Sequence, residues 1–102
     1  MQICIDMVKI KRLEKLLENQ SAIKRIFNDS ELTDNTATLA GRLAAKEAYF
    51  KAKGKKGNWL DIKVTKNTAG QPFFFIKGKK VKSILLSISH EDEYALAIVI
   101  IK

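Results

Sequence analysis

The sequence predicts an α+β fold in which an antiparallel sheet packs on one long helix and one or two shorter helices. Three observations predict it. Apolar residues between positions 9 and 27 recur at helical spacing, an alanine-rich stretch from Ala37 to Ala52 follows, and short apolar runs separated by turn residues fill the second half. Helices followed by antiparallel strands are typical of α+β domains. With 102 residues, positions 1–102 are expected to form a single domain.

The first 30 residues predict one strand and then helix. Residues 3–8 are apolar except for Cys4 and Asp6, which suits a short strand. Residues 9–27 place isoleucines and leucines among charges at a spacing near 3.6, as in one amphipathic helix or two. The polar stretch 28–30 interrupts this pattern, and Ser30 is the expected cap of a short turn that runs through Leu32.

The main helix is expected to start at Asp34 or Thr36 and to run to Lys53, because Gly54 is a typical helix end. Glu47 and Lys51 are four positions apart and therefore share one face of this helix. Such a pair usually contributes only about 0.2 to 0.5 kcal/mol as an exposed salt bridge. Alternatively, the carboxylate holds a hard cation while the ammonium reaches a phosphate bound by the same cation.

The second half predicts strands. A first strand is expected from Trp59 through Leu60, Ile62 and Val64, and a turn over 67–72 joins it as a hairpin to a second strand, 73–76. Residues 84–89 and 94–101 predict two further antiparallel strands, joined at 90–93. The last four apolar residues are expected to be buried on both faces. The lysine-rich segment 77–82 is expected to be solvated and mobile.

Composition limits the class of protein. Hydrophobic residues make up 46% of the chain, but no apolar run approaches the roughly 18 residues of a membrane span, so a soluble protein without a membrane partner is expected. Charges such as Asp6, Lys9 and Lys11 also argue against a secretory signal. The single cysteine, Cys4, cannot form an internal disulfide, which favours a reducing, cytoplasmic setting.

The net charge of +8 indicates a polyanionic partner. Nucleic acid is one candidate, since Trp59 and the run Phe73-Phe74-Phe75 stand among lysines. These aromatics are more readily explained as core residues, and a recognisable RNA-binding strand signature is absent. The charge alone does not choose between nucleic acid and another acidic partner.

Asp6 and Glu47 are the candidate metal ligands. Mg²⁺ prefers oxygen ligands and typically takes one or two carboxylates together with water and phosphate oxygens. An aspartate inside an apolar strand is costly unless its charge is compensated, although Asp6 could instead cap the helix that follows it. Lys46 lies on a neighbouring helix face and is expected to be solvated.

Three separated motifs carry a resemblance to a known family. Cys4-Ile5-Asp6 stands near the start, Leu43 begins a stretch with Lys46-Glu47-Ala48 and Lys51, and Ser87-Ile88-Ser89-His90 precedes the last apolar run. In this order they resemble the Gly-x-Asp, the aromatic-x-x-Lys-Glu-Ala-x-x-Lys helix and the Ser-x-Ser-His strand end of the holo-acyl-carrier-protein synthase family. The resemblance spans nearly the whole chain, and further matching positions are Arg12, Ala40-Gly41-Arg42, Gly54, Asp61-Ile62 and Gly70-Gln71-Pro72.

The resemblance implies the 4'-phosphopantetheinyl transferase fold and a homotrimer with active sites at subunit interfaces. It implies transfer of 4'-phosphopantetheine from the substrate coenzyme A to a serine of an acidic acyl carrier protein, with Mg²⁺ as cofactor and without nucleic acid. Adenosine 3',5'-bisphosphate would be the second product.

The resemblance also implies roles for individual residues. Asp6 and Glu47 match the metal-binding carboxylates, and together with Lys51, which would neutralise the leaving phosphate, they form the expected catalytic set. Arg12 is the expected contact to the carrier protein. Coenzyme A would be bound by Arg42, Lys51, Gly54, Ser89 and His90, with His90 near the 3'-phosphate. The general base stays open between Glu47 and a metal-bound water.

Two positions depart from the family pattern. Cys4 stands where the family usually has glycine, and Leu43 where it usually has phenylalanine or tryptophan. Neither departure removes a charged group. They keep open a further alternative, a weakened member that binds carrier protein without turnover.

Overall fold

The computed structural model describes residues 1–102, with helices and strands close to those expected. Strand β1 (Gln2–Lys9) leads into helices α1 (Ile10–Leu16) and α2 (Gln20–Ile26) and the 3-10 helix η1 (Asp29–Glu31). The long helix α3 (Thr36–Lys53) and the 3-10 helix η2 (Trp59–Asp61) follow. The remaining strands are β2 (Ile62–Lys66), β3 (Pro72–Ile76), β4 (Lys79–Lys80), β5 (Ile84–His90) and β6 (Tyr94–Ile101).

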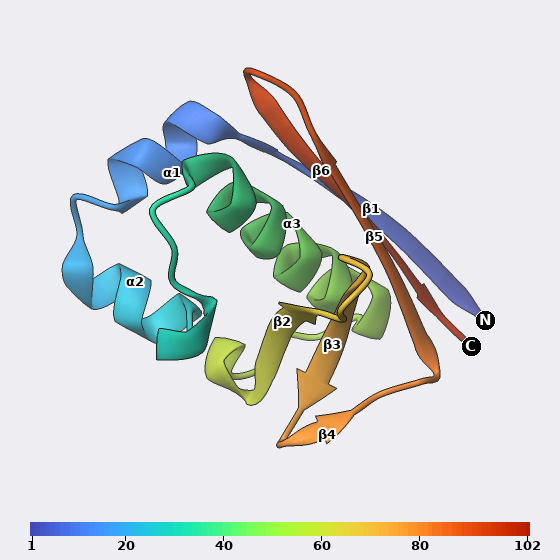
Figure 1. The fold of residues 1–102 in the computed structure, drawn as a ribbon. Coiled ribbons are helices and arrows are strands. Elements are labelled where there is room, and N and C mark those ends of the chain that lie inside the picture. Colours follow the sequence, from blue (N-terminus) through green and yellow to red (C-terminus); the bar gives the residue numbers. More distant parts are fainter.

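The strands form two antiparallel sheets, where the sequence had predicted one. The order is β1-β6-β5 in the first sheet and β2-β3-β4 in the second. Helix α3 packs on the first sheet with α1 and α2 on its other side, β3 of the second sheet contacts β5, and the two chain termini lie side by side at one end of the first sheet (Figure 1). The predicted α+β class is confirmed, with α3 at the centre of the packing.

Small side chains let α3 approach its neighbours closely. Ala40, Ala44, Ala45 and Ala48 are fully buried in the core. A Cβ atom built on Gly41 would lie 2.7 Å from Ile88 Cγ2 of β5, so this glycine permits the close packing of helix and strand. The Asn35 side chain caps the helix start by accepting a hydrogen bond from the Thr38 N–H at 3.0 Å.

The end of α3 was predicted correctly. Gly54 has a φ of 73°, in the left-handed region, and its N–H donates to the Phe50 and Lys51 carbonyls. Such a conformation costs about 1 to 2 kcal/mol for residues with a Cβ atom. The chain therefore turns sharply after Lys53 into the basic loop that borders the site described below.

The first sheet buries one face against α3 and leaves the other partly open. Val8 of β1 and Ala95, Ala97 and Val99 of β6 are buried, whereas Ile3, Ile5 and Met7 of β1 are exposed. Opposite these three, Ile100, Ile98 and Leu96 of β6 are half-buried. The prediction that the last apolar residues are buried on both faces is therefore wrong in this chain, because only alternate residues of β6 face the helix.

Three local predictions also need correction. Residues 59–61 form a 3-10 helix, and the strand begins only at Ile62. The segment 77–82 is largely exposed, as expected, but it contains β4, which pairs with β3. The short turn before α3 begins at Asn28 and not at Ser30, because the Glu31 carboxylate reaches back to the Asn28 N–H at 2.9 Å.

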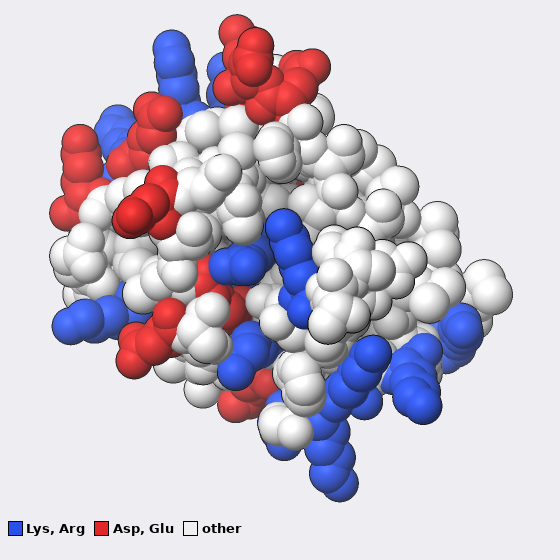
Figure 2. Space-filling view, viewed as in Figure 1, with Lys and Arg blue, Asp and Glu red and all other residues white.

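Charges are unevenly distributed over the surface. Figure 2 shows basic side chains gathered at the end of the molecule that carries β4, whereas acidic side chains lie at the opposite end and along the side that carries α1 and α2. The lysines of the β3–β4 region and the acidic β5–β6 turn, Glu91, Asp92 and Glu93, are exposed. None of the helices is both long and apolar enough to cross a membrane.

Candidate active site

Asp6 and Glu47 face each other at the edge of one pocket. Asp6 is on β1 and points inward, since even-numbered residues of this strand turn toward α3, where Glu47 lies. The pocket has a volume of about 510 Å³. It is lined by the two carboxylates, by Arg12 and Lys51, by Phe50 and Trp59, and by the loop residues Gly54, Lys55 and Lys56. Five predicted site residues, Asp6, Arg12, Glu47, Lys51 and Gly54, thus come together.

The negative charges of the two carboxylates are not fully compensated by neighbouring cations and hydrogen-bond donors. Burial raises the pKa of Glu47 above 4.5, hydrogen bonding and charge from Asp6 raise it further, and Arg12 opposes the shift. Asp6 Oδ2 is buried and has no hydrogen-bond partner. Two adjacent carboxylates, one with an unpaired buried oxygen, match the donor set that Mg²⁺ takes from a protein. No third carboxylate, histidine or cysteine joins them, so the remaining ligands would come from water or substrate.

The cationic side chains around the two carboxylates do not form the salt bridge between Glu47 and Lys51 that helical spacing suggested. Lys51 does not pair with Glu47. Its ammonium donates to the Ile5 carbonyl at 2.9 Å and lies 3.6 Å from Asp6 Oδ1, while Arg12 Nη2 donates to Glu47 Oε1 at 2.8 Å. Lys51 is largely exposed and lines the pocket, so its ammonium is accessible to an anion bound there.

Arg42 and His90 line a second, smaller pocket on another face of α3. Arg42 is five positions before Glu47, which places it about 140° around the helix. This pocket of about 140 Å³ is also lined by Thr38, Val64, Lys66, Gly70, Pro72 and Ile88. Ser89 is exposed and pairs with Leu96 of β6. Its side chain points to the opposite face of β5 from the side chains of Ile88 and His90, which line this pocket. Within one chain, the predicted coenzyme A residues are therefore not brought together. Lys51 and Gly54 line the first pocket, Arg42 and His90 line the second, and Ser89 lines neither.

A third hollow of about 390 Å³ lies between α1, α2 and α3 and joins the first pocket. Arg12, Glu47 and Trp59 line both. Leu43 is 1% exposed and forms part of this hollow with Leu16 and Ile26, so it keeps the apolar packing expected of an aromatic residue there. Cys4 is half-buried against the core on the inner face of β1.

Sequence reasoning missed the buried ion pair of Glu31 and Lys46. Lys46 was expected to be solvated, but both side chains are 0% exposed, and Lys46 Nζ donates to Glu31 Oε1 at 2.7 Å. Burial lowers the pKa of Lys46, and the hydrogen bond and charge of Glu31 oppose this shift. The Asn28-x-x-Glu31 spacing, typical of a capping box, was the one available signal that Glu31 turns inward.

The aromatic residues do not form one exposed platform. Phe74 is fully buried, and Trp59 packs on Phe50 with ring centroids 5.1 Å apart. Phe73 and Phe75 lie half-buried on the other face of β3, where Lys80 covers the Phe73 ring at 4.4 Å. The expectation that these aromatic residues belong to the core therefore holds for Phe74. The structure offers no stacking surface that would favour the alternative of a nucleic-acid-binding module.

Known proteins resemble this chain along almost its full length. A family model described as the 4'-phosphopantetheinyl transferase superfamily matches residues 2–99. A holo-[acyl-carrier-protein] synthase of Nautilia profundicola is 39% identical, with 95% of this chain and 96% of that protein covered. The similarity thus includes both the strand of Asp6 and the last strand.

Solved structures agree in fold. A holo-(acyl-carrier-protein) synthase of Bacillus anthracis in complex with CoA (3',5'-ADP) has a TM-score of 0.83 at 34% identity, covering 98% of this chain and 94% of that one. A Helicobacter pylori holo-[acyl-carrier-protein] synthase in complex with coenzyme A has a TM-score of 0.84 at 32% identity, covering 98% and 99%. Both of these relatives bind coenzyme A or its nucleotide part.

Proposed function

Because the chain belongs to the 4'-phosphopantetheinyl transferase superfamily, we propose that residues 1–102 act as one transferase domain with its chemistry in the Asp6–Glu47 pocket. The chain transfers 4'-phosphopantetheine from coenzyme A to a serine of apo acyl carrier protein, giving holo acyl carrier protein and adenosine 3',5'-bisphosphate. The observation that carries the location of the site is the carboxylate pair beside a basic loop, whose negative charge neighbouring cations compensate only in part.

Asp6 and Glu47 would hold Mg²⁺. When bound, this ion supplies charge neutralisation of a pyrophosphate and makes its phosphorus a better target for attack. The proposed metal dependence rests on the donor set of the chain and on the motif match.

Lys51 is proposed to bind the departing phosphate, because its ammonium projects into the pocket from the turn of α3 that follows Glu47. In the reaction, the serine oxygen of the carrier protein forms a bond to the β-phosphorus of coenzyme A. The bond to the adenosine bisphosphate oxygen breaks, and the hydroxyl proton passes to a base. That base is Glu47, whose raised pKa suits a proton acceptor, or a water beside it.

Arg12 is the proposed contact to the acidic carrier protein. It stands on α1 at the rim of the pocket and is 58% exposed. The positive charge of the chain favours approach of an acidic partner in the reducing, cytoplasmic setting that a single free cysteine suggests.

A homotrimer is proposed. The number of subunits rests on the resemblance to the family, and two observations of the structure support self-association. The open face of the β1-β6-β5 sheet carries exposed apolar side chains, Ile3, Ile5 and Met7 of β1 and Leu85 of β5. Between them lie the half-buried Leu96, Ile98 and Ile100 of β6, so the apolar row crosses all three strands. Such contiguous apolar surface is typical of a protein interface. In addition, Arg42 and His90 are separated from Asp6 and Glu47 within one chain, and a neighbouring subunit would bring the two groups together.

The function is tested by incubating the protein with coenzyme A, Mg²⁺ and apo carrier protein, and detecting the phosphopantetheine adduct by mass spectrometry. Asp6→Ala and Glu47→Ala are expected to remove the metal-dependent adduct while the protein remains folded. Glu14→Ala, which removes a carboxylate from an exposed position of α1 outside the pocket, is the matched control. The absence of any adduct with every divalent metal tried would contradict the proposed function. Titration with carrier protein would then show whether the chain is a weakened member that binds carrier protein without turnover.

A further inference from the structure

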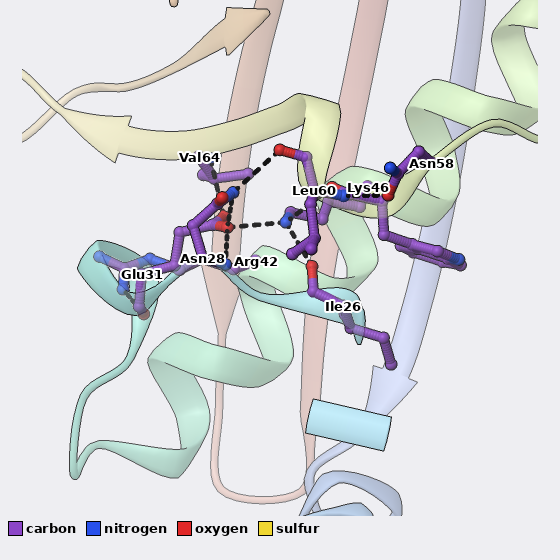
Figure 3. Close-up of polar contacts among 9 residues, drawn as sticks. Ile26, Asn28, Glu31, Arg42, Lys46, Asn58, Leu60 and Val64 are labelled. Atoms are coloured by element: carbon purple, nitrogen blue, oxygen red, sulfur yellow. Dashed lines mark hydrogen bonds and ion pairs between the residues drawn. The ribbon is translucent and has the colours of Figure 1, made fainter. Parts of the chain in front are cut away.

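The buried pair of Glu31 and Lys46 lies between the two pockets of the chain. Neither side chain is accessible to solvent. Figure 3 shows the pair at the centre of a hydrogen-bonded cluster that joins α2, η1, α3, η2 and β2. The pair itself is outside the candidate active site, because neither Glu31 nor Lys46 lines one of the three pockets described above.

Lys46 uses all three of its ammonium protons. Besides the bond to Glu31, it donates to the Ile26 carbonyl at 2.6 Å and to the Trp59 carbonyl at 3.2 Å. These carbonyls belong to the end of α2 and to η2. One side chain of α3 thus fixes two segments that are far apart in the sequence.

Glu31 is bonded through both carboxylate oxygens. Oε1 accepts hydrogen bonds from the Asn28 N–H and side-chain amide at 2.9 and 3.0 Å, in addition to the bond from Lys46. Oε2 accepts from the Val64 N–H of β2 at 2.9 Å. The backbone carbonyl of Glu31 accepts a hydrogen bond from Arg42.

The groups held by this cluster form walls of both pockets. Trp59 lines the first pocket with Glu47, and Lys46 directly precedes Glu47 on α3. Arg42 and Val64 line the second pocket with His90. A change at the pair would therefore be transmitted to the carboxylate site and to the basic pocket.

Stability alone is a weak reason for such a pair. Desolvation of two charges offsets most of their attraction, and well-packed apolar residues of similar size are often as stable. Hydrogen bonds with fixed directions, in contrast, orient the segments that they join. The geometry of the cluster is therefore better explained by positioning than by stabilisation.

We propose that Glu31 and Lys46 are positioning residues that hold Glu47 and Trp59 on one side, and Arg42 and Val64 on the other, in the geometry needed for metal and substrate. The inference rests on the proposed function, since it concerns residues of the same site. Neither Glu31 nor Lys46 contacts the reacting atoms in this assignment.

The test compares Glu31→Gln, Lys46→Met and the double variant of both. Each single variant leaves one buried charge without its opposite charge and is expected to lower stability. The double variant removes both charges, so it is expected to recover much of the stability in urea unfolding. It does not restore the bonds from position 46 to the Ile26 and Trp59 carbonyls.

The readouts are the dissociation constant of Mn²⁺ measured by electron paramagnetic resonance, the emission of Trp59, and kcat and KM for coenzyme A. Trp59 is the only tryptophan, so the emission reports on the pocket wall. For the double variant we expect about tenfold weaker Mn²⁺ binding, a shifted emission and a lower kcat, despite the recovered stability. Ile84→Ala, a core change that lines neither pocket, should lower stability while leaving Mn²⁺ binding and emission unchanged.

Recovery of Mn²⁺ binding, emission and kcat together with stability in the double variant would overturn the proposal and leave the pair a purely structural one. The proposal would also be overturned if Ile84→Ala weakened Mn²⁺ binding and shifted the Trp59 emission as much as the double variant does. Failure of the proposed function is recognised separately, because it requires that the unchanged protein form no adduct. The emission of Trp59 still tests the positioning in that case, since it needs neither turnover nor metal.

Discussion

Arg12 Nη2 lies 2.8 Å from Glu47 Oε1, joining α1 to α3 across 35 positions of sequence. The arginine is mostly exposed and the carboxylate mostly buried. This contact partly compensates Glu47, whose pKa is raised by burial and by Asp6. The residue proposed to meet the carrier protein is therefore also in contact with a proposed metal ligand.

Arg12→Gln is expected to raise the KM for carrier protein several-fold, with a smaller effect on kcat. The change removes an exposed positive charge at the pocket rim, and surface charges act mainly on the rate of encounter. The KM of the variant should also depend less on salt than that of the unchanged protein. Steady-state kinetics at low and high salt measure both effects.

Lys11→Gln is the matched control, since it removes the same charge from the same helix at a position that borders Glu93 instead of Glu47. A similar rise in KM for both variants would attribute the effect to net charge and not to Arg12.

Asp6→Asn is expected to stabilise the metal-free protein by about 1 kcal/mol, because the change removes a charge that opposes ionisation of Glu47. The loss of Lys51 as a partner offsets little of this gain, since that ammonium is 57% exposed and 3.6 Å away. The same variant should lose the increase in melting temperature that Mg²⁺ gives the unchanged protein. Thermal unfolding with and without Mg²⁺ measures both. A destabilised metal-free variant would show that the carboxylates do not oppose each other.

The stabilisation by Mg²⁺ is expected to grow with rising pH. Glu47 has a raised pKa in the folded protein, so its contribution to stability is present below pH 4.5 and is lost as pH rises through the folded pKa. A divalent metal requires the ionised carboxylate and offsets that loss. Melting curves with and without Mg²⁺ between about pH 4 and pH 8 should therefore diverge as the pH increases. Glu47→Gln should remove the divergence, and parallel curves in the unchanged protein would argue against Glu47 as a ligand.

The sequence predicted α3 and its end well because local signals decide them. Alanine content favours the helix, and Gly54 adopts the left-handed conformation that ends it. The spacing of apolar residues likewise separated the strands of the second half. Residues 59–61 form a 3-10 helix instead of the predicted strand, because the Asn58 side chain accepts a hydrogen bond from the Leu60 N–H at 3.0 Å and starts a tight turn. The pattern of apolar residues does not reveal this turn.

The candidate site was predicted from motif order, whereas its internal contacts were not. The pairing of Glu47 with Arg12 instead of Lys51 depends on how α1 packs on α3, which spacing along one helix does not specify. Burial of Lys46 depends on carbonyls from α2 and η2 that converge only in the folded chain. Long-range packing is thus the part that the sequence leaves open.

Gly41→Ala is expected to destabilise the protein by up to about 2 kcal/mol. Alanine gains about 1 kcal/mol in helix propensity, but overpacking costs about 1 to 3 kcal/mol, and the new Cβ atom would lie 2.7 Å from Ile88 Cγ2. Adding Ile88→Ala removes the colliding methyl group, so the two changes should be coupled in a double-mutant cycle of urea unfolding. Additive effects would show that α3 and β5 adjust to the extra atom without strain.

Mixing two inactive variants tests whether neighbouring subunits share a site. Asp6→Ala damages the carboxylate pocket and His90→Ala damages the basic pocket, which lie on different faces of α3. Suppose that each active site combines the carboxylate pocket of one subunit with the basic pocket of its neighbour. When equal amounts of the two variants are refolded together, each of these pockets is undamaged with a probability of about one half, so both are undamaged at about one site in four. Adduct formation should then recover to about a quarter of that of the unchanged protein. Each variant refolded alone should stay at its own low level, which serves as the control. If both pockets of one chain serve the same site, every site in the mixture carries one damaged half, and no recovery occurs.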